Sequence, residues 1–260
     1  MRMRSIALLL LLVSPAAALA DECRAVSGAH TTALVELYTS EGCSSCPPAD
    51  RWLSSVESPR SQQRFVPIAF HVNYWDYIGW KDAFADGRYT ERQRSFARVT
   101  GARSVYTPQV VVGGRDFPHW AGERRVKDAI DAVNRKPARA TLEVRSLARP
   151  GGGVIAVVSA EVLPGHDAKD LALVAALTQD GISSRVTAGE NRGELLRHDF
   201  VARDVAERRG FDRAPRASAS LPAEFKAQPG WDAARSSLVA FVQDMKSGEI
   251  LQALATPLCR

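Results

Sequence analysis

The pattern of apolar and polar positions divides the chain into two parts that predict different secondary structure. In the first part, near-continuous apolar runs at residues 32–39 and 65–71 are typical of strands buried on both faces of a sheet. Helical segments are predicted at residues 50–56, 89–97 and 123–133. This alternation of strands and helices predicts an α/β domain over residues 21–137, with a helical insertion at about residues 73–103.

The second part begins after Pro137, where the pattern of predicted elements changes. From Ala140 onwards, short β-rich runs are separated by turn signals, such as the glycines at 151–153. The runs lie at residues 141–147, 154–163, 171–178, 195–205, 237–245 and 249–254. Short strands at this spacing predict an all-β, sandwich-like domain over residues 138–260.

Residues 1–20 have the pattern of a secretory signal peptide. Two arginines precede an apolar run at residues 6–13, and small residues end at Ala20, before Asp21. We predict cleavage after Ala20 and a periplasmic or secreted mature protein. The alternative, a retained membrane anchor, needs a longer apolar run. No other stretch is long and apolar enough to span a bilayer, so we expect no membrane association after cleavage.

Composition and charge mainly exclude classes of partner. The formal net charge is +5 at pH 7, and removal of the signal segment lowers it by two arginines. The remaining arginines are scattered among acids, without a basic run interleaved with aromatic residues, so we expect no nucleic-acid partner. No pattern in the chain specifies an oligomeric state.

The sequence Cys43-Ser44-Ser45-Cys46 follows the first apolar run, where a helix is predicted to begin. Free backbone N–H groups and the positive end of the helix dipole favour a thiolate at the first cysteine. We therefore predict that Cys43 is the nucleophile of a redox dithiol. Cys46 is then the resolving thiol, which attacks a mixed disulfide on Cys43. The same spacing occurs in zinc sites and in inert disulfides, and both alternatives stay open here.

A second motif, Thr107-Pro108, opens the β-branched run at residues 109–112. Proline is tolerated at the first residue of a strand, and a cis bond suits a tight turn. The order strand, Cys-x-x-Cys, helix, strand and Thr-Pro resembles the thioredoxin fold. The resemblance implies that Pro108, with Thr107, lies against the dithiol and holds the partner's backbone. The predicted fold class is thus an α/β thioredoxin-like domain with a helical insertion, followed by an all-β sandwich-like domain.

Longer runs resemble a bacterial family of secreted, thioredoxin-like proteins of uncharacterised function. These runs are VELYTSEGCSSCPPAD, FHVNYWDYIGWKDAF, YTERQRSFA and SVYTPQVVVGG. Two later runs, GENRGELLRHDFVARDV and VAFVQDMKSGEILQA, extend the resemblance over most of the mature chain. The resemblance implies the fold and brings no established substrate.

The remaining cysteines, Cys23 and Cys259, bracket the mature chain. In an oxidising compartment we expect them to form a structural disulfide that ties the two ends together. The competing interpretation makes one of them a third redox thiol that exchanges with Cys43.

Other polar and aromatic residues near the motifs are candidates for the site. By analogy with the buried acid of thioredoxins, Glu36 is the candidate proton acceptor for the resolving thiol; alternatively it faces solvent or pairs with an arginine. Tyr74, Trp75 and Trp80 form either a substrate platform beside the dithiol or a local core. His71 is either a ligand or proton carrier, or a hydrogen-bonded structural residue.

Three functions compete. We prefer a periplasmic or secreted thiol–disulfide oxidoreductase, whose partners are protein or small-molecule thiols and disulfides and which needs no bound cofactor or metal. The second is a copper or other metal chaperone that uses the dithiol with His71, since Cu(I) favours thiolates. The third is a non-catalytic binding protein in which the Cys43–Cys46 bond stays closed.

Overall fold

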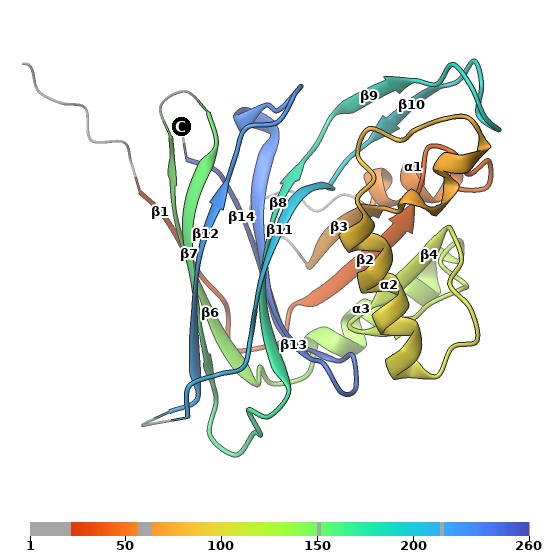
Figure 1. Cartoon of the computed structure of the whole chain (residues 1–260). Helices are drawn as coiled ribbons and strands as arrows, with labels where there is room; N and C mark the ends of the chain where they lie inside the picture. Colours follow the sequence, from red (N-terminus) through yellow and green to blue (C-terminus); the bar gives the residue numbers. More distant parts are fainter. Residues whose placement is uncertain (1–21, 57–63, 150–151, 214–215, 260) are drawn as a thin grey trace, which may run out of the picture.

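The computed structural model describes residues 22–56, 64–149, 152–213 and 216–259 (Figure 1). The predicted signal peptide lies outside the described residues. The described chain is mostly β, with few helices. None of its helices has the length and apolar character needed to cross a membrane.

Eight strands from both parts of the chain form one mixed sheet (Figure 1). They are β2 (Ala33–Thr39), β3 (Phe65–His71), β4 (Gln109–Val112), β5 (Arg115–Asp116), β8 (Leu171–Gln179), β11 (Val201–Arg209), β13 (Ser236–Asp244) and β14 (Ile250–Pro257). Their order across the sheet is β14-β13-β8-β11-β3-β2-β4-β5. β2 and β3 are parallel, and β11 joins the free edge of β3 in parallel at Val201 and Ala69. Four strands of the first part are therefore continued by four of the second.

The predicted fold class is wrong. We expected an α/β thioredoxin-like domain followed by a separate sandwich, but the two parts share the eight-stranded sheet. Ala69 N–H donates to Phe200 O at 2.8 Å, so the edge of β3 is paired with a segment far along the chain. An apolar run indicates that a strand is buried, but it does not specify which strand pairs with its edge. The domain boundary at 137/138 stays a prediction.

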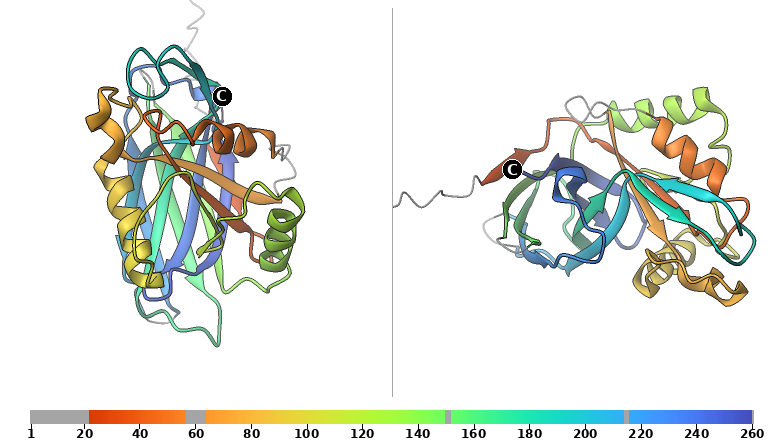
Figure 2. Two further views of the ribbon diagram at one scale, coloured as in Figure 1. Left: turned by 90° about the vertical axis from the view of Figure 1, so that its right-hand side faces the viewer. Right: turned by 90° about the horizontal axis from the view of Figure 1, so that it is seen from above.

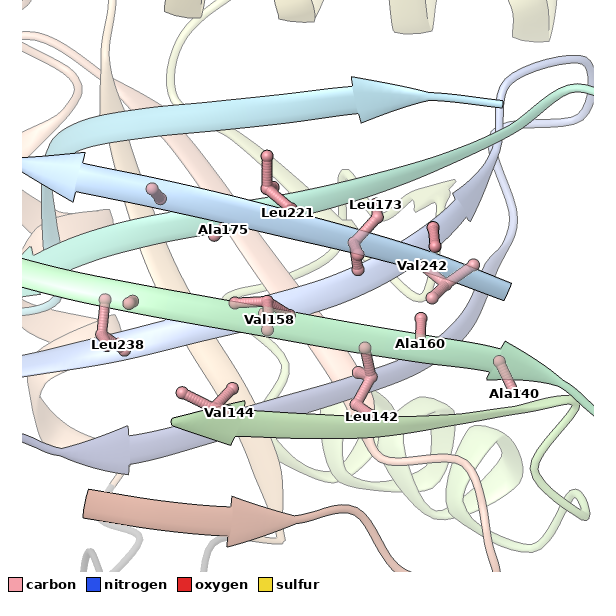
Figure 3. Close-up of a cluster of buried hydrophobic side chains, with 14 of the residues drawn as sticks. Ala140, Leu142, Val144, Val158, Ala160, Leu173, Ala175, Leu221, Leu238 and Val242 are labelled. Carbon is pink, nitrogen blue, oxygen red and sulfur yellow. The ribbon is translucent and has the colours of Figure 1, made fainter. Parts of the chain in front are cut away.

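A smaller antiparallel sheet covers one face of the large one. It contains β1 (Cys23–Val26), β6 (Ala140–Ala148), β7 (Val154–Val162) and β12 (Ser218–Phe225), in the order β1-β6-β7-β12. Buried and exposed residues alternate along β6 and β7, as expected for a sheet with one covered face. The buried face packs Leu142 and Val158 against Leu173 and Leu238 of the large sheet (Figure 3).

β8 is buried along its whole length because both faces are covered. Alternate residues, including Leu173, face the smaller sheet. The intervening residues, such as Val174, belong to a second core that also contains Tyr89 and Phe96 of α2 (Gly87–Thr100). This helix and the 3-10 helix η1 (Asn73–Ile78) connect β3 to β4.

Two further helices cover the other face of β2. α1 (Pro47–Ser55) contributes Ala49 and Leu53, and α3 (Glu123–Asn134) contributes Val126 and Ile130, to a core with Leu37. In the view from above, α1 and α3 lie on one side of β2 and β3, and α2 lies on the other (Figure 2). Alternate residues of β2 therefore face different helices.

The hairpin of β9 (Ile182–Arg185) and β10 (Leu195–His198) reaches over α1. It stands between β8 and β11 in the chain, so its position follows from the pairing of β11. Phe200, in the bend between β10 and β11, has a left-handed φ of 59°. Such a conformation costs on the order of 1–3 kcal/mol. Phe200 N–H donates to Asp180 Oδ1 at 2.9 Å, which helps to hold the bend.

Disulfide bonding, expected from the cysteine content, is confirmed. Cys23 of β1 is bonded to Cys259, and their Cα atoms are 5.5 Å apart. The bond closes a loop with a sequence separation of 236. In the loop-entropy description, closing so long a loop raises the free energy of the unfolded chain.

We predict that Cys23→Ser with Cys259→Ser lowers the free energy of unfolding by about 2–5 kcal/mol, because the unfolded chain regains the entropy of the open loop. Urea unfolding followed by circular dichroism measures the change. The native spectrum without urea serves as the control for an intact fold. An unchanged midpoint and slope would contradict the prediction.

Candidate active site

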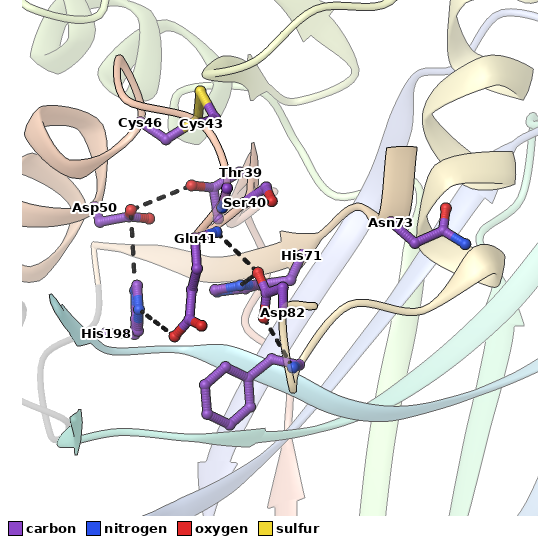
Figure 4. Close-up of polar contacts among 12 residues, drawn as sticks. Thr39, Ser40, Glu41, Cys43, Cys46, Asp50, His71, Asn73, Asp82 and His198 are labelled. Carbon is purple, nitrogen blue, oxygen red and sulfur yellow. Dashed lines mark hydrogen bonds and ion pairs between the residues drawn. A yellow bond between two sulfur atoms is a disulfide. The ribbon is translucent and has the colours of Figure 1, made fainter. Parts of the chain in front are cut away.

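The Cys43–Cys46 disulfide lies where β2 ends and α1 begins (Figure 4). The two Cα atoms are 5.4 Å apart, and both cysteines are 0% exposed. Cys46 has helical dihedral angles, φ −80° and ψ −38°, and precedes Pro47 and Pro48 in the first turn. The two prolines have no N–H, and Ala49 N–H donates to Cys46 O at 2.9 Å. The helix start therefore offers few free N–H groups to a Cys43 thiolate.

The Thr107–Pro108 peptide, which is cis, lies beside Cys43. Thr107 O is 3.9 Å from Cys43 Sγ, and Ser45 Oγ is 3.3 Å from the same sulfur. Trp75 Nε1 donates to Thr107 Oγ1 at 2.7 Å. The structure thus brings Thr107, its neighbour Pro108 and Trp75 to the dithiol, and their roles in binding a partner stay predictions.

The loop between β9 and β10 holds the dithiol segment from the other side. The buried Asn191 side chain donates through Nδ2 to Glu41 O at 2.8 Å and to Cys43 O at 3.0 Å. Ser44 N–H donates to Glu190 Oε2 at 2.9 Å. A loop from the second part of the chain therefore fixes the backbone on which the nucleophile candidate sits.

The aromatic residues predicted as a platform are half-buried and attached to the site. Trp80 Nε1 donates to Glu41 Oε2 at 2.8 Å. The ring of Tyr74 lies 6.4 Å from that of Trp75, whereas the neighbouring Tyr77 is 82% exposed. The indole N–H groups of both tryptophans thus position residues around the dithiol, and their contact with a substrate stays a prediction.

Beneath the disulfide lies a buried charge cluster of two histidines and three carboxylates (Figure 4). Its members are Glu41, Asp50, His71, Asp82 and His198. His71 Nδ1 bonds Asp82 Oδ2 at 2.7 Å, and His198 Nε2 is 3.3 Å from Glu41 Oε1. The two imidazoles meet edge to face with centroids 4.9 Å apart. His71 Nε2 and His198 Nδ1 are buried without a hydrogen-bond partner in the part of the chain that the structure describes.

Burial and mutual attraction set the charges in this cluster. Burial alone would lower the pKa of His71, but the attraction and hydrogen bond of Asp82 outweigh it and raise that pKa to about 9. Burial opposes ionisation of Asp82, yet the facing His71 lowers its pKa. Burial raises the pKa of Asp50, and the nearby histidines offset this only in part. Near neutral pH, His71 and Asp82 therefore form a buried ion pair.

Glu36 lies on the face of β2 turned away from α1. Its Oε1 accepts from Arg92 Nη2 at 2.6 Å and Nε at 2.8 Å, and from Tyr38 OH at 3.2 Å. Arg92 also stacks over the ring of Phe241, 4.9 Å from its centroid. The arginine pair, which was the alternative for Glu36, is thus present. This position gives no support to Glu36 as the proton acceptor, a role that no observation tests.

Within the described ranges, no group of three or more His, Cys, Asp or Glu side chains is arranged to hold a metal ion. His71, the proposed extra ligand of a metal chaperone, is bonded to Asp82 instead. Sequence reasoning did not name Glu41, Asp50, Asp82, Asn191 or His198 as site residues. Glu41 and Asp50 had a local signal, because they lie close to the dithiol in the chain; the other three come from distant segments that only the folded chain brings together.

The fold and the site together define a protein with one large mixed sheet and a buried disulfide between a strand and a helix. Loops from both parts of the chain surround this disulfide. The chain belongs to the family described as a protein of unknown function, DUF1223, whose model matches residues 34–243. The resemblance to an uncharacterised family is therefore confirmed, whereas the thioredoxin-like superfamily is not. No curated protein matches the chain.

Two solved structures are similar in fold to most of this chain. One is the crystal structure of protein AGR_C_4864 from Agrobacterium tumefaciens, which is 24% identical with a TM-score of 0.60 and covers 88% of this chain and 95% of its own. The other is HBP35 of Porphyromonas gingivalis, which is 16% identical with a TM-score of 0.64 and covers 89% of this chain and 76% of its own. At these identities the similarity extends to the fold alone.

We predict that stability falls as the pH rises from about 6.5 to 9, because the His71 proton that the folded state holds is lost. Because the pKa of His71 is higher in the folded chain than in the unfolded chain, His71 contributes its full stabilisation below the unfolded-state pKa. It contributes none above the folded-state pKa. The shift corresponds to on the order of 3 kcal/mol. On the acid side, the lowered pKa of Asp82 makes its contribution fade only as the pH falls below its ordinary range.

Urea unfolding at a series of pH values tests this prediction in wild type and His71→Gln. The variant should be less stable at pH 6 and show a flatter profile up to pH 9. His166→Gln is the control, since His166 is exposed and has no side-chain hydrogen bond in the described chain. Parallel profiles for wild type and His71→Gln would refute the assignment.

We predict that Asn191→Ala accelerates reduction of the Cys43–Cys46 bond by dithiothreitol. Two neutral hydrogen bonds contribute about 1 kcal/mol each, so loosening the loop should raise the rate about 10- to 30-fold. Mass-spectrometric thiol counting in a Cys23→Ser, Cys259→Ser background measures it. Arg192→Ala is the matched control, because its exposed guanidinium makes no hydrogen bond within the described ranges. Equal rates in both variants would mean that the loop does not limit access.

Proposed function

We propose that this protein is a thiol–disulfide oxidoreductase that acts outside the cytoplasm through Cys43 and Cys46. The observation that supports it best is the Cys43–Cys46 bond between β2 and α1, with the Thr107 carbonyl 3.9 Å from Cys43 Sγ. A cysteine pair between a strand and a helix, beside the cis Thr107–Pro108 peptide, is suited to exchange with a partner sulfur once that sulfur reaches Cys43.

The reaction transfers two electrons between a partner and the pair. A partner thiolate attacks Cys43 Sγ, the bond to Cys46 breaks, and Cys46 leaves as a thiolate that takes up a proton. A second partner thiolate then attacks the partner sulfur of the mixed disulfide and releases Cys43. The partner dithiol becomes a disulfide and the protein pair becomes a dithiol. In reverse, Cys43 attacks a partner disulfide and Cys46 resolves the adduct.

Access to Cys43 is the main requirement that this function places on the structure. Cys43 is fully buried, and Thr107 O lies 3.9 Å from its sulfur. Trp75 is hydrogen-bonded to Thr107, and Asn191 is hydrogen-bonded to the backbone carbonyl of Cys43. A partner must displace part of this cover. Trp75, with Tyr74 and Trp80, then provides aromatic surface for a peptide or small thiol, and Pro108 with Thr107 holds its backbone.

The location outside the cytoplasm has two supports. The signal-peptide pattern of residues 1–20 predicts export, and two disulfides, Cys23–Cys259 and Cys43–Cys46, are typical of oxidising compartments. Cleavage after Ala20 and a periplasmic or secreted mature protein belong to the same proposal.

The complete burial of both sulfurs favours a second candidate, a binding protein in which the Cys43–Cys46 bond stays closed. The reduction potential separates the two. Equilibration with glutathione or dithiothreitol in the Cys23→Ser, Cys259→Ser background should give a value between roughly −120 and −270 mV for an exchanging pair. A value below about −300 mV would leave the closed disulfide as the better account.

We predict that Cys46→Ser forms a stable mixed disulfide with a short peptide that contains one disulfide, because Cys43 attacks and no resolving thiol remains. Cys43→Ser should form far less adduct under the same conditions. Non-reducing mass spectrometry identifies the modified residue. Equal or absent adducts with both variants would count against the nucleophile assignment.

A further inference from the structure

Asp50 stands one turn after Cys46 on the same face of α1. Cys46 already has helical dihedral angles, and Asp50 N–H donates to Cys46 O at 3.2 Å. Side chains four residues apart on a helix are neighbours, with about 5–6 Å between Cβ atoms. Cys46 is 0% and Asp50 7% exposed, so both residues are buried at the start of α1, and the Asp50 side chain lies between the disulfide segment and His198 (Figure 4).

The Asp50 carboxyl accepts a hydrogen bond from one neighbour and lies near a second polar group without a hydrogen bond to it. Oδ2 accepts from Thr39 Oγ1 at 3.2 Å. His198 Nδ1 lies 3.9 Å from the same oxygen, and it is a buried nitrogen without a hydrogen-bond partner in the described chain. The imidazole is oriented by Glu41, whose Oε1 is 3.3 Å from Nε2. An unsatisfied ring nitrogen thus faces a buried carboxyl next to the dithiol.

Asp50 and His198 also border a cleft of about 410 Å³ that opens to solvent between α1 and β10. Ser44, Pro47, Arg51 and Arg197 line the same cleft. The sulfurs themselves are buried and do not line it. The two residues therefore connect the interior beside Cys46 with water.

We propose that Asp50 exchanges a proton with Cys46 and that His198 passes this proton between Asp50 and the cleft. The inference rests on the proposed exchange reaction. When the Cys43–Cys46 bond breaks, the Asp50 carboxyl gives its proton to the Cys46 thiolate and is reprotonated through His198 from water. When Cys46 attacks a mixed disulfide, the Asp50 carboxylate accepts the thiol proton, and the Cys43–Cys46 bond forms as the Cys43–partner bond breaks. The partner leaves as a thiolate, which takes up a proton from water.

The surrounding charges are compatible with this role. His71 and Asp82 form a compensated pair on the interior side, and Glu41 accepts from Trp80. On the cleft side stand Arg51, Glu190, Arg192, Glu194 and Arg197. Burial raises the pKa of the Asp50 carboxyl, which brings it closer to the range in which it exchanges protons with a thiol.

The first experiment titrates Cys46 by the ultraviolet absorbance of its thiolate in a reduced Cys23→Ser, Cys43→Ala, Cys259→Ser background. The proposal expects a two-step curve, because thiol and carboxyl titrate as a coupled pair. Asp50→Asn should give a single step, shifted to lower pH by about one unit because a like charge is removed. Glu194→Gln, which removes an exposed carboxylate of the same cleft, should leave the two-step curve in place.

The second experiment measures how fast Cys46 releases a small chromophoric thiol from a mixed disulfide on Cys43. Near pH 7, Asp50→Asn should lower the rate of release about tenfold or more. The rate in this variant should rise in proportion to the hydroxide concentration, whereas the rate of wild type should depend less on pH. His198→Gln should steepen the profile with a smaller loss, and Glu194→Gln should match wild type.

The outcomes separate this inference from the proposed function. A potential below about −300 mV, together with a two-step titration, would remove the exchange function but keep the Asp50–Cys46 coupling. Normal exchange, with unchanged titration and release in Asp50→Asn, would overturn the proton-transfer role alone. If Asp50→Asn does not fold, the titration of the background variant that keeps Asp50 tests the proposal by itself. A single titration step of Cys46 near the ordinary thiol pKa of about 8.5 would overturn it.

Discussion

The candidate site depends on the hydrogen bonding that joins β11 to the edge of β3. Ala69 N–H donates to Phe200 O, and Val201 pairs with Ala69. This contact fixes the start of β11, so the hairpin of β9 and β10 before it must lie over α1. Asn191 and His198 are carried on that hairpin. Without the pairing, the dithiol segment would lose its cover and the buried charge cluster would lose one of its imidazoles.

The site holds several charged groups that are buried from solvent, and their pairing offsets much of the cost of burial. Burying one unpaired charge costs several kcal/mol, and a partner with good hydrogen bonds offsets much of that cost. His71 is matched by Asp82, and Glu36 by Arg92 on the opposite face of β2. Within the described residues Asp50 has no such full partner, since its carboxyl meets Thr39 and, at 3.9 Å, a nitrogen of His198. It is therefore the carboxyl in the cluster that is best able to change its protonation.

Sequence reasoning succeeded where the determining residues are close together in the chain. Local patterns of polarity and turn residues were enough to place Cys43 and Cys46 between a strand and a helix and to place Thr107–Pro108 before a strand. They also predicted most strand and helix segments. The strand that pairs with the edge of β3 could not be predicted in this way, because the sequence of β11, VARDVAERR, does not specify which strand it pairs with. For the same reason, neither the identity of the arginine that pairs with Glu36 nor the pairing of His71 with Asp82 could be predicted, since charged residues give no local signal of which opposite charge they will meet.

The Cys23–Cys259 bond has a mechanical consequence. The two cysteines lie near the two ends of the described chain, with Cα atoms 5.5 Å apart. A pulling force applied to the flanking ends would therefore pass through a single covalent bridge and bypass both sheets. The enclosed residues, including the dithiol and its cover, would stay unloaded until that bridge was reduced. Tension on the ends and the chemistry of Cys43 are thereby insulated from each other.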